Sequence, residues 1–231
     1  MDYRYLFRPL QIGGMELKNR IAMPAINHSY SEDGHVNERL ISYYAARSRG
    51  GAGLITVGGC SVHELGRSFR NLGIYNDSFQ QGLQKLTEAV HAEGAKIAAQ
   101  LYHAGGYAKS VEIGGQALAP SSFSCRYTHE TPRKMEESDI AAVQNSFAQA
   151  AVRAKNAGFD AVEIIGSAGY LVAEFLSSYT NLRGDQYGGD LGNRSRFLVE
   201  IVQAIHREAG NDYPVIVRLS GNDFVNGGNC N

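Results

Sequence analysis

The stretch "AAVRAKNAGFDAVEIIG", residues 150–166, decides the fold because its hydrophobic pattern changes part-way through. Its first half continues a helical pattern in which Ile140, Val143 and Phe147 fall on one face. Gly158 follows, and glycine is the residue that most often ends a helix. The second half, "AVEII", is a short apolar run typical of a strand buried on both faces. The stretch therefore predicts a helix, a tight turn and a buried strand.

The same order of elements recurs along the chain. Comparable stretches are "YYAARSRGGAGLITVGG" (43–59), "LTEAVHAEGAKIAAQL" (86–101) and "IVQAIHREAGNDYPVIVRLS" (201–220). Together with "NRIAMPAI" (19–26), they predict five parallel strands joined by helical crossovers. An alternation of this kind indicates an α/β protein, built either as a doubly wound sheet or as a (β/α) barrel.

Polar residues and glycines at the strand ends favour the barrel. Gln100 and Arg218 lie within or at the carboxyl ends of otherwise apolar strands, and Gly58–Gly59 closes another. Such residues are expected where strand ends surround a shared site at the top of a TIM barrel. No G-x-G-x-x-G motif follows the first strand, which weakens the dinucleotide-binding alternative.

Two further segments interrupt the repeat. Roughly three dozen residues separate the third strand from Ser138, which is longer than an ordinary loop in such folds and predicts a functional loop or lid. Near the amino terminus, two short runs about Gly13–Gly14 predict a hairpin across the bottom of the barrel.

Composition limits the partners. The chain has 231 residues, 43% of them hydrophobic, and a formal net charge of -1, which predicts a soluble, well-cored domain. No Lys/Arg run is present, so we expect a small-molecule substrate and neither nucleic acid nor a membrane as partner. The absence of a signal sequence and of a long apolar run predicts a cytoplasmic protein. Cys60, Cys125 and Cys230 stand far apart, so no metal site is predicted.

Five stretches then carry a resemblance that covers nearly the whole chain. They are "LFRPLQIGGMELKNRIAMPAI", "AGLITVGG", "EGAKIAAQLYHAGG", "GFDAVEIIGSAGYLVAEFLSSYTNLRGDQYGGDLGNRSRF" and "VIVRLS". Their order and spacing resemble the Old Yellow Enzyme family, the NADH:flavin oxidoreductases, and "GSAGY" is most similar to the 2,4-dienoyl-CoA reductase branch. The resemblance implies a TIM barrel with FMN at its carboxyl face. NADH or NADPH would reduce the flavin, which in turn would reduce an activated C=C bond.

The resemblance also implies which residues contact the flavin. They are Pro24, Ala25, Ile26, Gly59, Gln100 and Arg218. The backbone of residues 24–26 would lie against the flavin ring, and Gly59 would allow close approach because it lacks a Cβ atom. Gln100 would hydrogen-bond the pyrimidine side, and the Arg218 guanidinium would stabilise negative charge near N1. Alternatively, Gln100 is a satisfied core amide and Arg218 is a structural partner of Glu163.

Tyr170 resembles the family's proton donor. Hydride addition to the β-carbon of an alkene leaves the α-carbon in need of a proton, and a phenol holds one at neutral pH. The competing interpretation is a tyrosine at the rim of the core, with its ring buried and its hydroxyl in water. Two positions depart from the small-enone reductases: Ile165 and Ala168 replace the side chains that bind the substrate carbonyl. Gly106 also replaces the arginine of the family's H-x-G-R segment.

Length is the largest departure. A TIM barrel has eight βα units and about 250 residues, whereas this chain ends soon after its fifth strand. We therefore expect residues 1–231 to be the amino-terminal part of an FMN-binding barrel domain. The remaining strands would lie outside it, together with any iron–sulfur or FAD domain. The alternative functions are an inactive half-barrel and an amine demethylase of the same family. The oligomeric state stays open.

Overall fold

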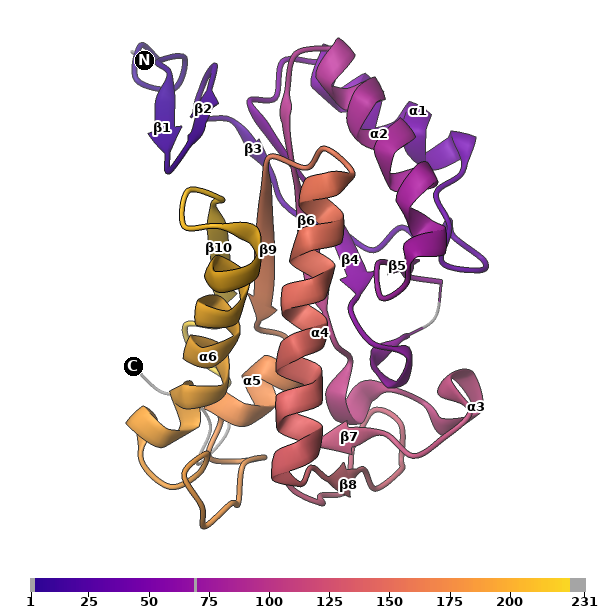
Figure 1. Ribbon diagram of the computed structural model, residues 1–231, viewed down its shortest axis with the longest axis vertical. Helices are drawn as coiled ribbons and strands as arrows, with labels where there is room; N and C mark the ends of the chain where they lie inside the picture. The colour runs from indigo at the N-terminus through magenta and orange to yellow at the C-terminus, as the bar shows by residue number, and fades with distance from the viewer. Residues whose placement is uncertain (1–2, 69, 225–231) are drawn as a thin grey trace.

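A parallel sheet with the strand order of a barrel carries the fold (Figure 1). The computed structural model describes residues 3–68 and 70–224. The sheet contains β3 (Ala22–Met23), β4 (Leu54–Ser61), β5 (Leu72–Gly73), β6 (Lys96–Tyr102), β9 (Ala161–Gly166) and β10 (Val215–Leu219). Its main order is β10–β9–β6–β4–β3, with β5 paired to β4. Each main strand neighbours the one before it, as in a barrel, whereas a doubly wound sheet reverses its order midway. The five predicted strands are confirmed.

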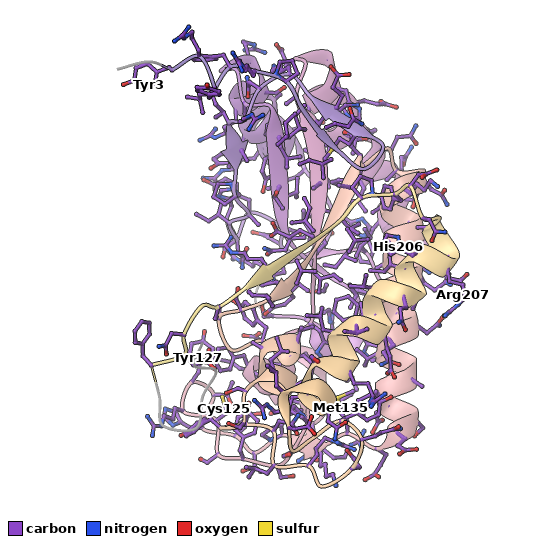
Figure 2. All side chains as sticks on the ribbon, turned by 90° about the vertical axis from the view of Figure 1, so that its left-hand side faces the viewer. Tyr3, Cys125, Tyr127, Met135, His206 and Arg207 are labelled. Atoms are coloured by element: carbon purple, nitrogen blue, oxygen red, sulfur yellow. The ribbon has the colours of Figure 1, made fainter. Side chains whose placement is uncertain are left out.

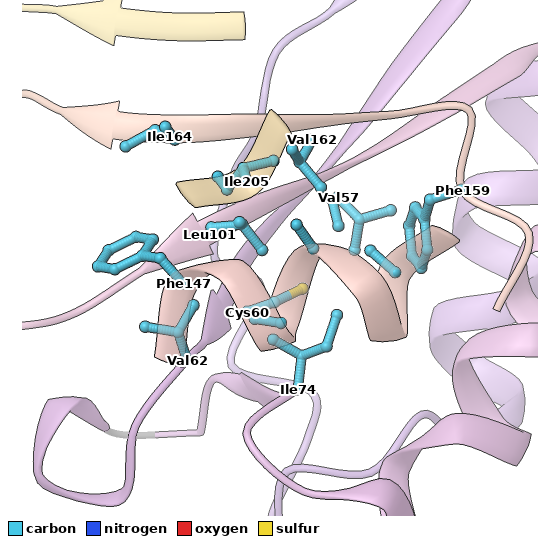
Figure 3. Close-up of a cluster of buried hydrophobic side chains, with 14 of the residues drawn as sticks. Val57, Cys60, Val62, Ile74, Leu101, Phe147, Phe159, Val162, Ile164 and Ile205 are labelled. Carbon is cyan, nitrogen blue, oxygen red and sulfur yellow. The ribbon is translucent and has the colours of Figure 1, made fainter. Parts of the chain in front are cut away.

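Four long helices form a layer against one face of the sheet. They are α1 (Glu38–Arg49), α2 (Gln80–Ala92), α4 (Glu137–Asn156) and α6 (Leu191–Ala209). Phe147 of α4 packs with Leu101 and Val162 in the core between helices and sheet (Figure 3). Gly94 and Gly158 follow α2 and α4 with φ of +85° and +89°, the left-handed backbone that favours glycine. The predicted helix stop at Gly158 is confirmed.

Side chains along β6 alternate between the core face of the sheet and the opposite face. Ile97, Ala99 and Leu101 of β6 belong to the core under the helices. Ala98 belongs to a separate cluster, and Gln100 follows it two residues later. Successive side chains of a strand point to opposite faces, so small and polar residues line the inner side of the sheet. This inner side is the interior of the barrel.

The predicted glycine pair does not end its strand. The β4 strand continues to Ser61, and its register with β6 shifts between Val57 and Cys60. Gly58 and Gly59 therefore form an irregularity inside the strand. A Cβ atom on Gly58 would overlap Ala25 of the neighbouring segment, so this close approach requires glycine.

The amino-terminal hairpin is confirmed at the end of the sheet opposite the strand carboxyl ends (Figure 1). Strands β1 (Leu10–Ile12) and β2 (Met15–Leu17) pair antiparallel. Met15 and Leu17 are buried against inner-face residues of the sheet such as Ala98. The Gly14 amide also donates to the Asp212 carbonyl at 3.4 Å, shortly before β10. The hairpin therefore covers the bottom of the barrel interior.

The long insertion is a small folded unit rather than an unstructured lid. It contains η3 (Gly105–Tyr107), α3 (Ser110–Ile113), and the parallel pair β7 (Leu118–Ala119) and β8 (Arg133–Lys134). Short 3-10 turns η1 (Glu64–Gly66) and η2 (Asp77–Phe79) follow β4 and β5. The insertion lies at the carboxyl ends of the strands with α5 (Leu171–Leu176) (Figure 1). In the described ranges, we find no helix with the length and apolar character needed to cross a membrane.

We expect Phe147→Ala to lower the free energy of unfolding by about 3–5 kcal/mol, because the fully buried ring would leave a cavity between helix and sheet. Urea unfolding of the purified chain measures this change. Val199→Ala on α6 is the control, since Val199 is 48% exposed and its truncation should change stability by about 0.5 kcal/mol or less. Equal effects of the two substitutions would contradict the assigned core.

Candidate active site

One cavity gathers six of the seven residues that the sequence predicted for the site. It has a volume of about 170 Å³ and lies where the strands end. The predicted residues in its wall are Ala25, Ile26, Gly59, Gln100, Tyr170 and Arg218. Pro24 precedes this group in the chain and is not among the lining residues. Parallel strands bring their carboxyl ends to one edge, which explains why residues far apart in sequence meet here.

Gln100 is held by a neighbouring strand. Its Nε2 donates to Glu163 Oε1 at 2.6 Å, and both side chains are buried. The two residues are register partners of β6 and β9. The amide nitrogen of Gln100 faces Glu163, so its carbonyl oxygen points to the other side, toward Gly58. The partner is a carboxylate, whereas the structural interpretation expected neighbouring backbone.

Arg218 is an exposed cation beside the cavity. Its register partner on β9 is Ile165, and Glu163 is occupied by Gln100. Within residues 3–68 and 70–224, no ion pair joins Arg218 to Glu163. The structural alternative for Arg218 is therefore not realised in this part of the chain. Its guanidinium has charge and donors to offer to an anionic group in the cavity.

Tyr102 is a cavity residue that the sequence analysis missed. Its hydroxyl donates to Ser68 Oγ at 3.0 Å, and Asn71 Nδ2 donates to the same oxygen at 3.1 Å. A Cβ atom on Gly59 would lie 3.1 Å from Tyr102 Cβ, so glycine at this position makes room for the tyrosine. Asn27, Asn71 and Ser167 also line the cavity without having been predicted. The sequence feature that could have identified Tyr102 as a site residue is its position at the carboxyl end of β6.

Tyr170 lies at the cavity as a neutral phenol. It precedes α5 as the N-cap residue, and the Leu171 amide donates to the His103 carbonyl at 3.1 Å. Its ring packs edge-on against Tyr102, with centroids 4.6 Å apart. Burial raises the pKa of Tyr170, the nearby Tyr127 adds to the rise, and a hydrogen bond with Tyr102 opposes it. The phenol therefore keeps its proton at neutral pH.

The cavity wall beside Tyr170 has no side-chain hydrogen-bond donor at positions 165 and 168, where the sequence differs from the small-enone reductases. Ile165 and Ala168 both line the cavity, and neither side chain can form a hydrogen bond. Ala168 has φ of +59°, a left-handed conformation uncommon for a residue with a side chain. Its amide donates to Ser220 Oγ at 3.4 Å, which links the ends of β9 and β10.

His103 and Gly106 belong to a buried turn rather than to the cavity. Burial lowers the pKa of His103 to about 3, and its Nδ1 accepts from the Gly105 amide at 3.1 Å. The Gly106 amide donates to Glu174 Oε1 at 2.8 Å. Burial raises the pKa of Glu174 well above its usual range. The turn therefore anchors the insertion with a neutral histidine.

The charged part of the "NLRGDQYGG" segment is structural. Arg183 is 5% exposed, and its NH1 donates to the Pro120 carbonyl at 2.9 Å and to the Met135 carbonyl at 2.6 Å. Its other nitrogens donate to the Asp185 carboxylate. One guanidinium thus fastens both strands of the insertion to the loop after α5. None of these residues lines the predicted flavin cavity.

The uncharged part of the same segment closes the loop. Asn181 Nδ2 donates to the carbonyls of Phe175 and Tyr187, both at 2.7 Å. The Tyr187 hydroxyl donates to Glu200 on α6 at 2.9 Å. A side chain on Gly188 would overlap the Arg183 backbone, which explains the first glycine of the pair. Residues 181–188 therefore stabilise the loop between α5 and α6.

Cys60 and Cys125 are buried free thiols, and Cys230 lies outside the described residues. In residues 3–68 and 70–224, no group of three His, Cys, Asp or Glu side chains could hold a metal ion.

The chain is similar to proteins of known class. A model of the NADH:flavin oxidoreductase / NADH oxidase family matches residues 5–230. A metal reductase of Desulforamulus reducens is 51% identical over 226 residues. This match covers 98% of the present chain and 34% of that protein, so the chain spans about a third of this relative.

Two solved structures share the fold. A 2-naphthoyl-CoA reductase in complex with 2-naphthoyl-CoA has a TM-score of 0.94 at 34% identity, over 99% of this chain and 37% of that one. Morphinone reductase in complex with tetrahydroNAD has a TM-score of 0.90 at 33% identity, over 97% of this chain and 66% of that one. The described strands correspond to part of the TIM barrel of these proteins, which confirms the predicted fold class.

We expect Arg183→Ala to lower the free energy of unfolding by about 3 kcal/mol, because it removes a buried charge partner and leaves two carbonyls without their donor. Urea unfolding gives the stability change, and limited proteolysis reports loosening of the insertion. Arg207→Ala is the control, because its side chain is 68% exposed. Unchanged stability and unchanged protease resistance in Arg183→Ala would contradict the fastening role.

Proposed function

The chain belongs to the NADH:flavin oxidoreductase / NADH oxidase family, the Old Yellow Enzyme family, and we propose that it carries the amino-terminal part of an FMN-dependent oxidoreductase. The proposed reaction is reduction of an activated C=C bond of an enoyl or dienoyl thioester or related enone. NADH or NADPH is the proposed electron donor. One observation supports this most strongly: Gln100, Arg218 and Tyr170 meet in a single cavity.

The side chains in the cavity wall support the proposal of a flavin site. Arg218 contributes a cation, and Gln100 contributes a carbonyl oxygen whose orientation is set by Glu163. Gly59 lines the cavity, and the space beside it that a side chain would fill is occupied by Tyr102. Ala25 and Ile26 would contact the ring, and Pro24 remains a predicted backbone contact. When bound, FMN would supply the transfer of hydride from NAD(P)H to the alkene.

Arg218 is proposed to stabilise the negative charge that hydride arrival creates at the flavin. Arg218 is exposed in the described residues, and its guanidinium would stabilise this charge more strongly once water is excluded from the site. The β10 strand sets the position of Arg218 opposite Ile165. The same charge favours binding of the reduced, anionic ring over the neutral one.

Tyr170 is proposed to deliver the proton that completes alkene reduction. The proton resides on its phenol oxygen, which the raised pKa keeps protonated at neutral pH. The Leu171 amide and the His103 carbonyl hold the start of α5, and Tyr102 packs on the ring edge. The donor is therefore positioned before a substrate binds.

We prefer a thioester over a small enone as the proposed substrate. Ile165 and Ala168 supply no donor for a substrate carbonyl, so groups other than these must hold the acyl end. The solved 2-naphthoyl-CoA reductase binds a CoA thioester, and it is 34% identical to this chain. The dienoyl-CoA-like branch assignment therefore remains our preferred form of the proposal.

We expect Arg218→Met to weaken FMN binding about 10- to 100-fold, because one charge-assisted contact is worth about 1.5–3 kcal/mol. Quenching of flavin fluorescence on titration measures the affinity. The flavin that stays bound to Arg218→Met should have a lower reduction potential, because a positive charge beside it has been removed. Arg207→Met serves as the control, since Arg207 lies on α6 away from the cavity.

A chain that cannot be loaded with FMN would favour the alternative of an inactive half-barrel. An unchanged flavin potential in Arg218→Met would leave Arg218 without the proposed electrostatic role.

We expect Tyr170→Phe to leave flavin reduction by NAD(P)H unchanged and to slow alkene reduction about 10²–10⁴-fold, the usual contribution of a positioned general acid. Stopped-flow measurement of the two half-reactions with a dienoyl thioester separates these effects. In the parent protein the alkene step should not depend on pH until the solution exceeds the raised pKa of the phenol, above about 10. Equal slowing of both half-reactions would contradict proton donation by Tyr170.

A further inference from the structure

We propose that a chamber of four tyrosines selects substrates whose double bond carries an aromatic ring, and that Tyr107 and Tyr127 of the insertion make this selection. The inference rests on the proposed function, since it names the substrate class of that site. The tyrosine chamber is a cavity of about 620 Å³ lined by Tyr102, Tyr107, Tyr127 and Tyr170. Lys109 also lies in its wall.

The tyrosine chamber adjoins the predicted flavin cavity. Asn27, Tyr102 and Tyr170 line both of them. A ligand in the chamber therefore contacts the proposed proton donor and lies beside the flavin site. This placement makes the chamber the space for the group attached to the reacting double bond.

The rings of the chamber are arranged to receive another ring. The rings of Tyr102 and Tyr107 both pack edge to face against the Tyr170 ring, at centroid distances of 4.6 and 5.9 Å. Tyr107 and Tyr127 are tilted by 42° at 5.4 Å. An aromatic guest gains edge-to-face or offset contacts from such walls, whereas a saturated ring of the same size gains only area burial. Burial raises the pKa of Tyr102 and Tyr107, so their rings are neutral.

Backbone hydrogen bonds hold the loop that carries Tyr127. The His129 amide donates to the Cys125 carbonyl at 2.9 Å, and the Cys125 amide donates to the Glu130 carbonyl at 3.0 Å. Lys109 Nζ lies 5.5 Å from the centre of the Tyr127 ring. Tyr127 lies near Cys125 in Figure 2 and is 63% exposed, so a bound ring can bury it. Holding the loop in advance reduces the entropy lost on binding.

Aromatic contacts would also compensate for the missing carbonyl clamp. Ile165 and Ala168 cannot orient a substrate through its oxygen, so orientation must come from another part of the substrate. A ring packed against Tyr107 and Tyr127 would fix the attached double bond near Tyr170. The site would thus recognise the substituent on the alkene rather than its carbonyl group.

The test compares two ligands that differ only in the aromaticity of one ring. Isothermal titration calorimetry with (E)-cinnamate and (E)-3-cyclohexylacrylate measures binding to the purified chain without hydride transfer. Both ligands carry the same C=C bond and carboxylate. We expect cinnamate to bind about tenfold more tightly, since two aromatic contacts at about 0.5–1.5 kcal/mol each give a factor of this size.

Three variants assign the preference to the chamber. Tyr127→Ala should weaken cinnamate binding about 3- to 10-fold and leave cyclohexylacrylate binding nearly unchanged, whereas Tyr127→Phe should retain the preference. Tyr5→Ala is the matched control, because Tyr5 is 64% exposed and lies outside the chamber. Equal affinity for the two ligands, binding of neither, or equal losses in Tyr127→Ala and Tyr5→Ala would overturn the inference. A failure to bind FMN would instead affect the proposed function, because the titration does not require the flavin.

Discussion

The parallel register of β4, β6 and β9 is the constraint on which the rest of the structure depends. It aligns the strands so that every second residue of β6 points to the inner face, and it sets Gln100 opposite Glu163. Their hydrogen bond satisfies two polar side chains in a region from which water is excluded. A slip of one residue would turn Gln100 toward the helices and bury it unpaired. The position of the candidate site therefore follows from the register of the sheet.

The insertion is the second level of organisation, and one buried guanidinium attaches it to the barrel. Arg183 joins the carbonyls of Pro120 and Met135 to Asp185. Glu174 performs a related task inside the turn that carries Tyr107, through the Gly106 amide. Neither contact involves a group that reacts in the proposed mechanism. They matter for function because the tyrosines of the insertion can select a ligand only if their backbone is fixed.

Much of this fold was predictable because its repeating pattern is local. Each predicted strand is present, and so are the hairpin about Gly13 and the helix stop at Gly158. The role of Gly58–Gly59 was predicted wrongly as a strand end, because the need for glycine arises from Ala25, which is distant in sequence. The segment around Arg183 was recognised as specific to the family, yet its partners on the insertion could not be predicted. Hydrogen bonds to carbonyls at 120 and 135 depend on how the chain returns to the sheet.

By itself, the sequence determined the barrel-type order of strands, the family, and the group of residues near the strand ends, including Gln100, Tyr170 and Arg218. Hydrophobic periodicity encodes the strands. The spacing of the quoted motifs carries the resemblance that implies the family and these site residues. Only the tertiary structure decided that Gln100 pairs with Glu163, that Arg218 does not, and that Tyr102, Tyr107 and Tyr127 surround Tyr170. These facts depend on side chains from separate elements approaching one another, and that approach is fixed by sheet register and by the folding of the insertion.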